Sequence, residues 1–151
     1  MQALSISPAG PADIPDLALL FDAYRVFYEQ PSDISASAAY VAREVATGST
    51  RFFLARTKAG EAVGFVHLIP GTNTLVMRPM WYLEDLFVAP AARRTGVAEA
   101  LMREAERFAI ETCAERLTLA TAHDNHAAQA LYRKLGYERD DHFMHFHRVL
   151  P

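Results

Sequence analysis

The residues with the clearest chemical potential form a short loop, residues 93–98, between a strand-like run and an amphipathic helix. The run over residues 81–88 is rich in aromatic and β-branched side chains, and Pro90 ends it. The first backbone N–H groups of a helix have no intrahelical partner and lie at the positive end of its dipole. Gly96 lets the main chain approach a ligand closely and adopt a positive φ. We therefore predict that this loop binds phosphate.

A second segment, residues 125–137, has the composition of a short capped helix. Asn125 suits the N-cap, and Gly136 suits the left-handed position that follows a helix. Tyr132 follows Asn125 by seven residues, or about two turns, so both side chains lie on nearly one helix face. Taken alone, this segment is more typical of a structural helix with Tyr132 in the core than of a functional one.

The two segments together resemble the GCN5-related N-acetyltransferases. The loop reads Arg-x-x-Gly-x-Ala, and the later helix reads Asn-x-x-Ala, then Leu-Tyr-x-Lys-Leu-Gly-Tyr, each after its own predicted strand. The resemblance extends from the first predicted helix through Tyr137, and we predict a single domain over residues 1–151. It implies a mixed α/β fold with a sheet of about six to seven strands and about four flanking helices. That sheet is expected to splay between the strands ending near Val88 and Ala122.

The resemblance implies acetyl-coenzyme A as the cofactor. Its pyrophosphate is expected on the loop, and its pantetheine amides are expected to pair with backbone groups at the end of the preceding strand. The predicted cofactor-binding residues are Leu86, Phe87, Val88, Arg93, Arg94, Thr95, Gly96, Val97, Ala98, Asn125 and Ala128.

Acetylation of an amine needs a base to deprotonate the ammonium and an acid to protonate the leaving thiolate. The resemblance gives Tyr132 the role of general acid. Glu84 is our candidate base, because a Glu in a mostly apolar strand beside a cleft is poorly explained as simply solvated. Strand alternation places Tyr82, Glu84 and Leu86 on one face and Asp85 on the other. Two other roles for Glu84 stay open. It could form a hydrogen bond to a neighbouring strand, or it could contact the cation without acting as a base.

The run over residues 81–88 resembles the corresponding strand of the diamine and histone-tail branches of the family, in which adjacent acidic residues receive cationic substrates. In this chain the acidic pair is Glu84 and Asp85. Tyr28 and Glu29, at the exit of the first predicted helix, are further predicted substrate contacts, and Asp33 adds negative charge. We expect direct attack by a primary amine, polyamine-like or on a lysine side chain, in a ternary complex. An amino-acid or aminoglycoside acetyltransferase, and a non-catalytic acyl-coenzyme A sensor, are the alternatives.

Composition and charge limit the number of domains and the kinds of partner that we expect. The chain has 151 residues, of which 51% are hydrophobic and 22% charged, as expected for one domain with its own core. A net charge of −3 argues against a nucleic-acid partner. No apolar run approaches the ~20 residues of a membrane span, and the N-terminal residues do not resemble a leader. We expect a cytoplasmic protein without a membrane partner, and a homodimer is its candidate assembly.

Several side chains are expected to be structural. Cys113, near the end of a helical run, is interpreted as a small buried hydrophobe, and Tyr24 and Phe27 as core residues. The histidines lack the spacing and carboxylate or thiolate partners of a metal site, so no metal is predicted. His67 is interpreted as a hydrogen-bonded strand residue.

Hydrophobic periodicity predicts alternating helices and strands. The expected helices run from Asp13 to near Gln30, from Asp33 or Ser35 to near Gly48, from Gly96 to Glu111, and from Asn125 to just before Gly136. The expected strands cover residues 50–56, 62–69, 80–89 and 116–122, with one or two more in 137–149. Breaks are expected at residues 57–61 and 70–73.

Overall fold

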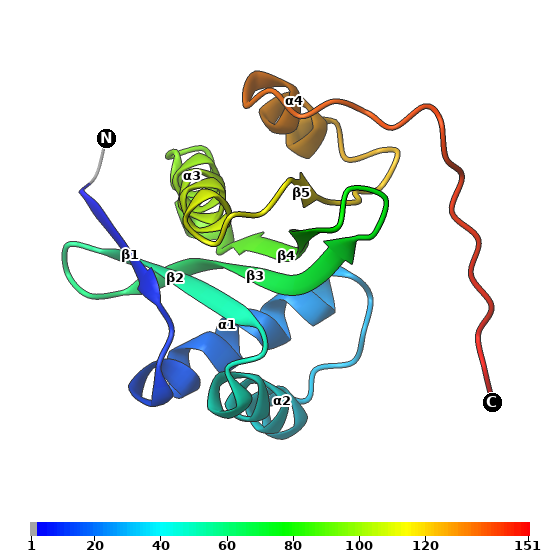
Figure 1. The fold of residues 1–151 in the computed structure, drawn as a ribbon. Helices are drawn as coiled ribbons and strands as arrows, with labels where there is room; N and C mark the ends of the chain where they lie inside the picture. Colours follow the sequence, from blue (N-terminus) through cyan, green and yellow to red (C-terminus); the bar gives the residue numbers. More distant parts are fainter. Residues whose placement is uncertain (1–2) are drawn as a thin grey trace. The chain divides into compact units, whose positions relative to one another are not determined.

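The computed structural model describes residues 3–151, which form two compact units that divide after Leu119. The first unit contains a five-stranded sheet of order β1-β2-β3-β4-β5. Its strands are β1 (Leu4–Pro8), β2 (Arg51–Thr57), β3 (Ala62–Asn73), β4 (Arg78–Val88) and β5 (Leu117–Thr118). Its helices are α1 (Ile14–Phe27), α2 (Ile34–Thr47) and α3 (Val97–Glu111), and the second unit contains α4 (His126–Lys134) (Figure 1).

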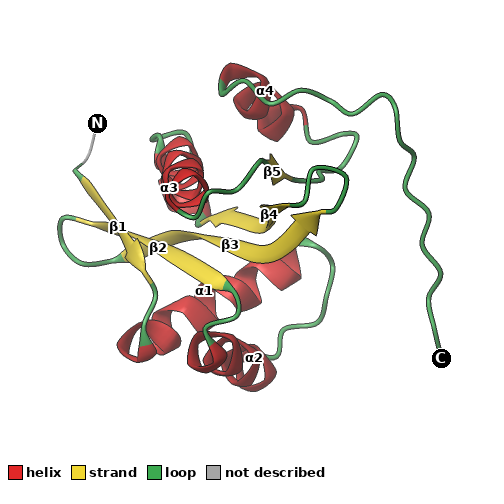
Figure 2. Ribbon diagram, viewed as in Figure 1, coloured by secondary structure: helices red, strands yellow, loops and turns green. Residues whose placement is uncertain are grey.

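The sheet of the first unit is covered on both faces, by α1 and α2 on one side and by α3 on the other (Figure 2). Strands β1 to β4 pair antiparallel, and β5 joins β4 in parallel. Because both faces are covered, four consecutive residues of β2, Phe52 to Ala55, are buried. Phe52 packs in the core under α1 and α2, whereas Phe53 contacts Phe108 of α3. The mixed α/β fold and the number of helices agree with the prediction.

Short-range sequence signals correctly predict both ends of α2 and the start of α1. Asp33 caps α2 by accepting a hydrogen bond from the Ala36 N–H at 2.9 Å, and Gly48, at φ +63°, ends this helix. Asp13 precedes α1 as predicted, but its side chain does not cap the helix. It accepts from the Gly10 N–H at 2.9 Å and pairs with Arg56 at 2.8 Å. Asp13 therefore ties the start of α1 to β2.

The expected break at residues 70–73 is wrong, because β3 continues to Asn73. Pro70 is tolerated there because β2 pairs with β3 only as far as Leu68, so no neighbour on that side needs its missing N–H. Gly71 is not a turn residue either. A Cβ at this position would lie 2.6 Å from the ring of Tyr82, so the glycine accommodates a cross-strand contact.

The expected strands near the C-terminus are also largely absent from the described residues. The strand predicted over 116–122 is reduced to β5, and residues 138–151 contain no helix or strand. Large side chains in this stretch, such as Phe143 and Phe146, are exposed. Alternation alone does not form a strand without a partner edge, so the sheet has five strands instead of six or seven.

Two further expectations about burial and helix ends need correction. Helix α1 ends at Phe27, three residues before the predicted end near Gln30. Cys113 is exposed, because α3 ends at Glu111 and the chain then turns with Cys113 at φ +58°. The helical pattern runs up to this cysteine, but the apolar stripe of α3 does not include it.

Candidate active site

A β-bulge in β4 sets the direction of the acidic side chains. His67 of β3 pairs with Asp85, whereas the next residue, Leu68, pairs with Leu83, so Glu84 is an extra residue in β4. The bulge interrupts the alternation of faces. The prediction that Glu84 and Asp85 point to opposite faces is therefore wrong.

The surroundings of two tyrosines support this correction. Burial raises the pKa of Tyr24 on α1, and a hydrogen bond to Asp85 and the charge of Glu84 raise it further. Burial also raises the pKa of Tyr40 on α2, with smaller contributions from Asp85 and Glu84 among its acidic neighbours. Both carboxylates thus act on the side of the sheet that α1 and α2 cover.

The two carboxylates differ in exposure. Glu84 is exposed at the bulge, so the expectation of a poorly solvated Glu does not hold. Asp85 is only 9% exposed and is linked to His67 across the sheet, with 2.8 Å between Oδ2 and Nδ1. Burial, followed by a hydrogen bond to Asp85, raises the pKa of Tyr24. Hydrogen bonds to a carboxylate compensate its burial.

His67 is the residue of this site that the sequence did not single out for function. It is fully buried, and its ring stacks on Phe52 with 3.9 Å between centroids. Its Nδ1 faces Asp85, but its Nε2 is buried without a hydrogen-bond partner in residues 3–151. The expectation of a hydrogen-bonded strand histidine is thus met on one side of the ring only. A polar residue inside the apolar run of β3 was the available signal.

The end of α1 contributes the aromatic part of the site. Tyr24 is half-buried and lies 5.1 Å, centroid to centroid, from the more exposed Tyr28. Glu29 follows in a left-handed conformation, at φ +62°, and is exposed. Phe27 is 53% exposed and was wrongly predicted to be core. The predicted contact Tyr28 is therefore next to the tyrosine that binds Asp85.

Asp33 serves the structure of the loop between α1 and α2. Its carboxylate caps α2, and its N–H donates to Asp22 at 2.7 Å. Asp22 is buried and also accepts from the hydroxyls of Ser32, at 2.7 Å, and Ser37, at 3.2 Å. The hydrogen bond from Ser32, followed by that from Asp33, holds the pKa of Asp22 below its usual value. The negative charge that the sequence assigned to Asp33 is thus engaged in the helix cap.

The predicted phosphate loop follows β4 through a 3-10 turn, Pro90–Ala92. Arg93 points back to the strand: its Nε donates to the Val88 carbonyl at 3.1 Å, and its guanidinium lies over the rings of Phe27 and Phe87. The next residue, Arg94, has φ +64°. Thr95 donates its hydroxyl to the Ala92 carbonyl at 2.7 Å. Side-chain contacts of Arg93 and Thr95 therefore shape the loop.

Helix α3 begins directly after this loop. Gly96 is its N-cap at φ +89° and provides no side chain to cap the first N–H groups, which start at Val97. The start of α3 is held close to β3 at Gly64. A Cβ on Gly64 would lie 2.8 Å from the Phe87 carbonyl oxygen and 3.2 Å from the Val97 side chain. The helix start thus presents its N–H groups beside the end of β4.

The second unit contains the other predicted residues. Asn125 caps α4 by accepting from the Ala128 N–H at 3.2 Å, and Gly136 has φ +89°, both as predicted. Tyr132 is half-buried, with its ring 6.1 Å from that of Tyr137. The Tyr137 N–H donates to the Tyr132 carbonyl at 2.9 Å. Tyr132 therefore lies in a well-defined helical turn of this unit.

Comparison with known proteins identifies the family. The model of the acetyltransferase (GNAT) family matches residues 17–137. The chain belongs to this family. It is 35% identical to the uncharacterized N-acetyltransferase YhfO of Bacillus subtilis strain 168, over 98% of this chain and 99% of the relative. A crystal structure of a probable acetyltransferase, 30% identical, superimposes with a TM-score of 0.92 and covers 97% of this chain and 98% of that one.

A shorter match concerns a relative with a named substrate class. The chain is 34% identical to the aminoglycoside N(6')-acetyltransferase type 1 of Acinetobacter haemolyticus over 82 residues. The matched segment covers 54% of this chain and 54% of the relative. The predicted family and the GNAT fold are thus confirmed, and the protein is an N-acetyltransferase.

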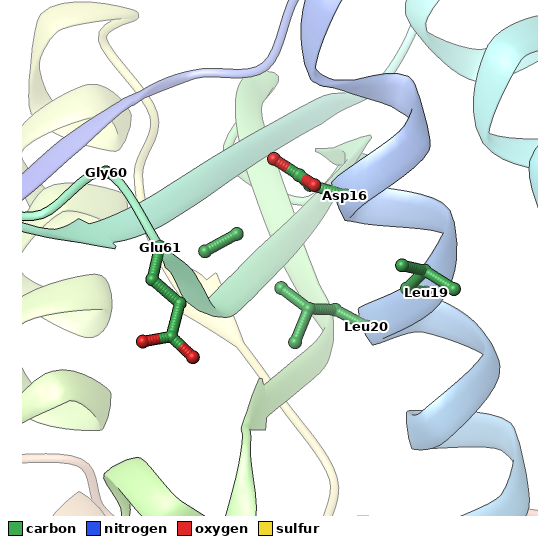
Figure 3. A pocket seen from close by; sticks show the side chains of 6 residues that line it. Asp16, Leu19, Leu20, Gly60 and Glu61 are labelled. Atoms are coloured by element: carbon green, nitrogen blue, oxygen red, sulfur yellow. The ribbon is translucent and has the colours of Figure 1, made fainter.

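A surface hollow lies within the first unit (Figure 3). It measures about 290 Å³ and lies between α1 and the turn that joins β2 to β3, lined by Asp16, Leu19, Leu20, Gly60, Glu61 and Ala62. Asp16 is already paired with Arg56 at 2.8 Å. None of the predicted catalytic or binding residues lines this hollow.

Residues 3–151 contain no helix that is long and apolar enough to cross a membrane. They also contain no group of three or more His, Cys, Asp or Glu side chains arranged to hold a metal ion.

Proposed function

We propose that this chain transfers the acetyl group of acetyl-coenzyme A to a primary amine by direct attack in a ternary complex. The observation that carries the proposal is the start of α3, where Gly96 at φ +89° leaves the first N–H groups without a side-chain cap. Such a helix start favours an anion, and the pyrophosphate of the cofactor meets that requirement. The GNAT match, which includes this loop, supports the same cofactor.

The cofactor would be held by backbone groups on both sides of the loop. Beyond Tyr82, β4 has no pairing with β5 in the described sheet, so this edge is available to the pantetheine amides at Leu86, Phe87 and Val88. Arg94, Thr95, Gly96, Val97 and Ala98 are proposed around the pyrophosphate. Arg93 would act mainly as a brace, because its side chain is engaged with Val88.

The proposal extends to the second unit. Asn125 and Ala128 are kept as cofactor contacts at the start of α4, although the Asn125 side chain also caps this helix. The family match runs across the division after Leu119, and we propose that the two units belong to one acetyltransferase domain.

The chemistry requires one group to remove a proton and another to supply one. Bound acetyl-coenzyme A supplies the thioester. We assign the base to Glu84, whose carboxylate is exposed at the bulge and can reach an ammonium in solution. We assign the acid to Tyr132, whose hydroxyl would donate to the leaving sulfur. No covalent acyl-enzyme is needed.

The acceptor is proposed to be a cationic amine, such as a polyamine or an exposed lysine. Glu84, Asp85 and Tyr28 gather around Tyr24, and carboxylates beside aromatic rings suit an ammonium group. An aminoglycoside is the second candidate. It is favoured by the identity to the Acinetobacter haemolyticus enzyme, and aminoglycosides also carry several ammonium groups.

Thiol release from acetyl-coenzyme A tests the proposal. The full chain would be assayed with spermidine, a lysine-containing peptide, kanamycin and a zwitterionic amino acid. We expect amine-dependent thiol release, with kcat/KM highest for a polycation. Preference for the amino acid would contradict the cationic acceptor only. Absence of thiol release with every amine would contradict the proposed activity.

A further inference from the structure

A buried polar cluster lies beside the exposed Glu84, on the side of the sheet that α1 and α2 cover. It consists of His67 on β3, Asp85 on β4 and Tyr24 on α1, three elements that are distant in sequence. His67 is fully buried, and Asp85 is 9% exposed. A buried ionisable cluster requires a physical explanation, because apolar side chains of similar size would fill the same space at lower cost.

The contact between His67 and Asp85 limits how the histidine ring is protonated. An ionised carboxylate only accepts hydrogen bonds, so with Asp85 ionised His67 donates from Nδ1 across the 2.8 Å contact. In the neutral ring, Nε2 is then a bare acceptor. This fits its surroundings, since Nε2 has no partner in residues 3–151 and the ring stacks on Phe52. In residues 3–151, the only hydrogen bond of the His67 ring is therefore the one to Asp85.

Tyr24 of α1 is the second neighbour of Asp85. Burial, followed by a hydrogen bond to Asp85, raises the pKa of Tyr24, so its hydroxyl keeps its proton at neutral pH. A carboxylate offers about four acceptor sites, and these two donors fill two of them. The Tyr28 ring lies 5.1 Å, centroid to centroid, from that of Tyr24, and Glu84 precedes Asp85 in β4.

We propose that His67 and Tyr24 are positioning residues that hold the Asp85 carboxylate as a fixed anion for the ammonium group of the acceptor amine. This inference rests on the proposed function and deepens it. The exposed Glu84 would remove the proton, whereas the fixed Asp85 would select for charge and orient the amine. Preorganised charge of this kind binds more tightly than a carboxylate that must be ordered on binding.

Matched variants separate this role from packing. His67→Phe keeps an aromatic ring against Phe52 but removes the donor to Asp85. His67→Asn removes the ring but keeps an N–H near the place of Nδ1. Tyr24→Phe removes only the second donor. Tyr40→Phe is the control, because the Tyr40 ring lies 6.5 Å, centroid to centroid, from that of His67 and no hydrogen bond joins it to Asp85 in the described residues.

The readout is the KM for the amine against the KM for acetyl-coenzyme A, measured on the full chain with spermidine and with kanamycin. We expect His67→Phe and Tyr24→Phe to raise the amine KM about tenfold, the scale of a hydrogen bond to a charged group. The acetyl-coenzyme A KM should stay within about twofold. His67→Asn should retain most of the amine affinity, and Tyr40→Phe should behave as wild type.

Three other results of this kinetic experiment would each overturn a specific proposal. Normal amine KM in His67→Phe with loss in His67→Asn would show that His67 only packs, and would overturn the proposal. A wild-type protein that binds acetyl-coenzyme A but acetylates neither polycation would overturn the cationic acceptor. A wild-type protein without thiol release for any amine would overturn the proposed function itself.

A spectroscopic test does not depend on turnover or on the folding of any variant. Nitrogen-15 NMR of the histidine side chains in the wild-type full chain reports which ring nitrogen carries the proton. We expect one buried histidine, assigned to His67, with a protonated Nδ1 and a bare Nε2 at neutral pH. The opposite tautomer would mean that His67 does not donate to Asp85, and would overturn the proposal.

Discussion

Glu84 is the extra residue at the bulge of β4. It is exposed, whereas the next residue, Asp85, is buried. We expect Glu84→Gln to lower kcat by about 10²-fold near neutral pH, the lower range for a general base. The defect should shrink as pH rises toward the pKa of the amine, because less substrate then needs deprotonation. A pH profile of kcat checks this. Raised KM with normal kcat would make Glu84 a binding contact only.

Tyr132 is a half-buried residue of α4, so its role as acid has to be separated from a role in packing. Tyr132→Phe removes the hydroxyl alone. We expect about a 10²-fold lower kcat with nearly unchanged affinity for acetyl-coenzyme A. Steady-state kinetics, calorimetric binding and thermal unfolding provide the measurement. Parallel losses in binding and stability would identify Tyr132 as a core residue.

The position of the loop over residues 93–98 depends on how closely α3 approaches β3. Gly64→Ala would place a Cβ 2.8 Å from the Phe87 carbonyl oxygen, against backbone that cannot yield cheaply. We expect a loss of about 1–3 kcal/mol, as for other overpacked sites, and weaker acetyl-coenzyme A binding because α3 shifts. Gly10→Ala is the control, since nothing lies within 4 Å of its Cβ position. Equal melting temperatures for the two variants would contradict this packing argument.

The carboxylate of Asp22 stabilises the loop between α1 and α2. Hydrogen bonds from Ser32 and Asp33 lower the pKa of Asp22 in the folded chain. Its stabilising effect is therefore present above the unfolded value near 4 and is lost as pH falls through the lower folded value. Thermal unfolding between about pH 5 and pH 3 should show a steeper decline for wild type than for Asp22→Asn. Parallel curves would exclude this contribution of Asp22.

Elements with local signals were predictable from sequence, and those that depend on distant partners were not. Asp33 and Asn125 cap α2 and α4 because a cap involves only residues within one turn. The bulge at Glu84 depends on the register between β3 and β4, which no local pattern contains. Its absence from the prediction led to the wrong face for Asp85. The partnership of Asp85 with His67 was missed for the same reason.

The family of the protein is established, whereas its ligand is proposed. The GNAT match and the fold establish an acetyltransferase, whereas the assignment of the site residues remains a prediction. The single domain over residues 1–151 also remains a prediction, since the described chain forms two units. All of these assignments require that acetyl-coenzyme A binds at the start of α3.

Two glycine variants separate binding at this loop from backbone strain. Gly96 and Gly60 have nearly the same left-handed conformation, at φ +89° and +88°, but only Gly96 precedes α3. A Cβ strains the backbone at both positions by about 1–2 kcal/mol. Both alanine variants should therefore melt lower without ligand. Only Gly96→Ala should lose the effect of acetyl-coenzyme A on the melting temperature.

Thermal unfolding with and without acetyl-coenzyme A tests whether the cofactor binds at the start of α3. A ligand that binds only the folded state at about 100 times its Kd adds about 2.7 kcal/mol, or roughly 5 to 10 °C in Tm for a chain of this size. We predict such a rise for wild type and for Gly60→Ala, and little or none for Gly96→Ala. An unchanged Tm of the wild-type protein at saturating acetyl-coenzyme A would contradict the account.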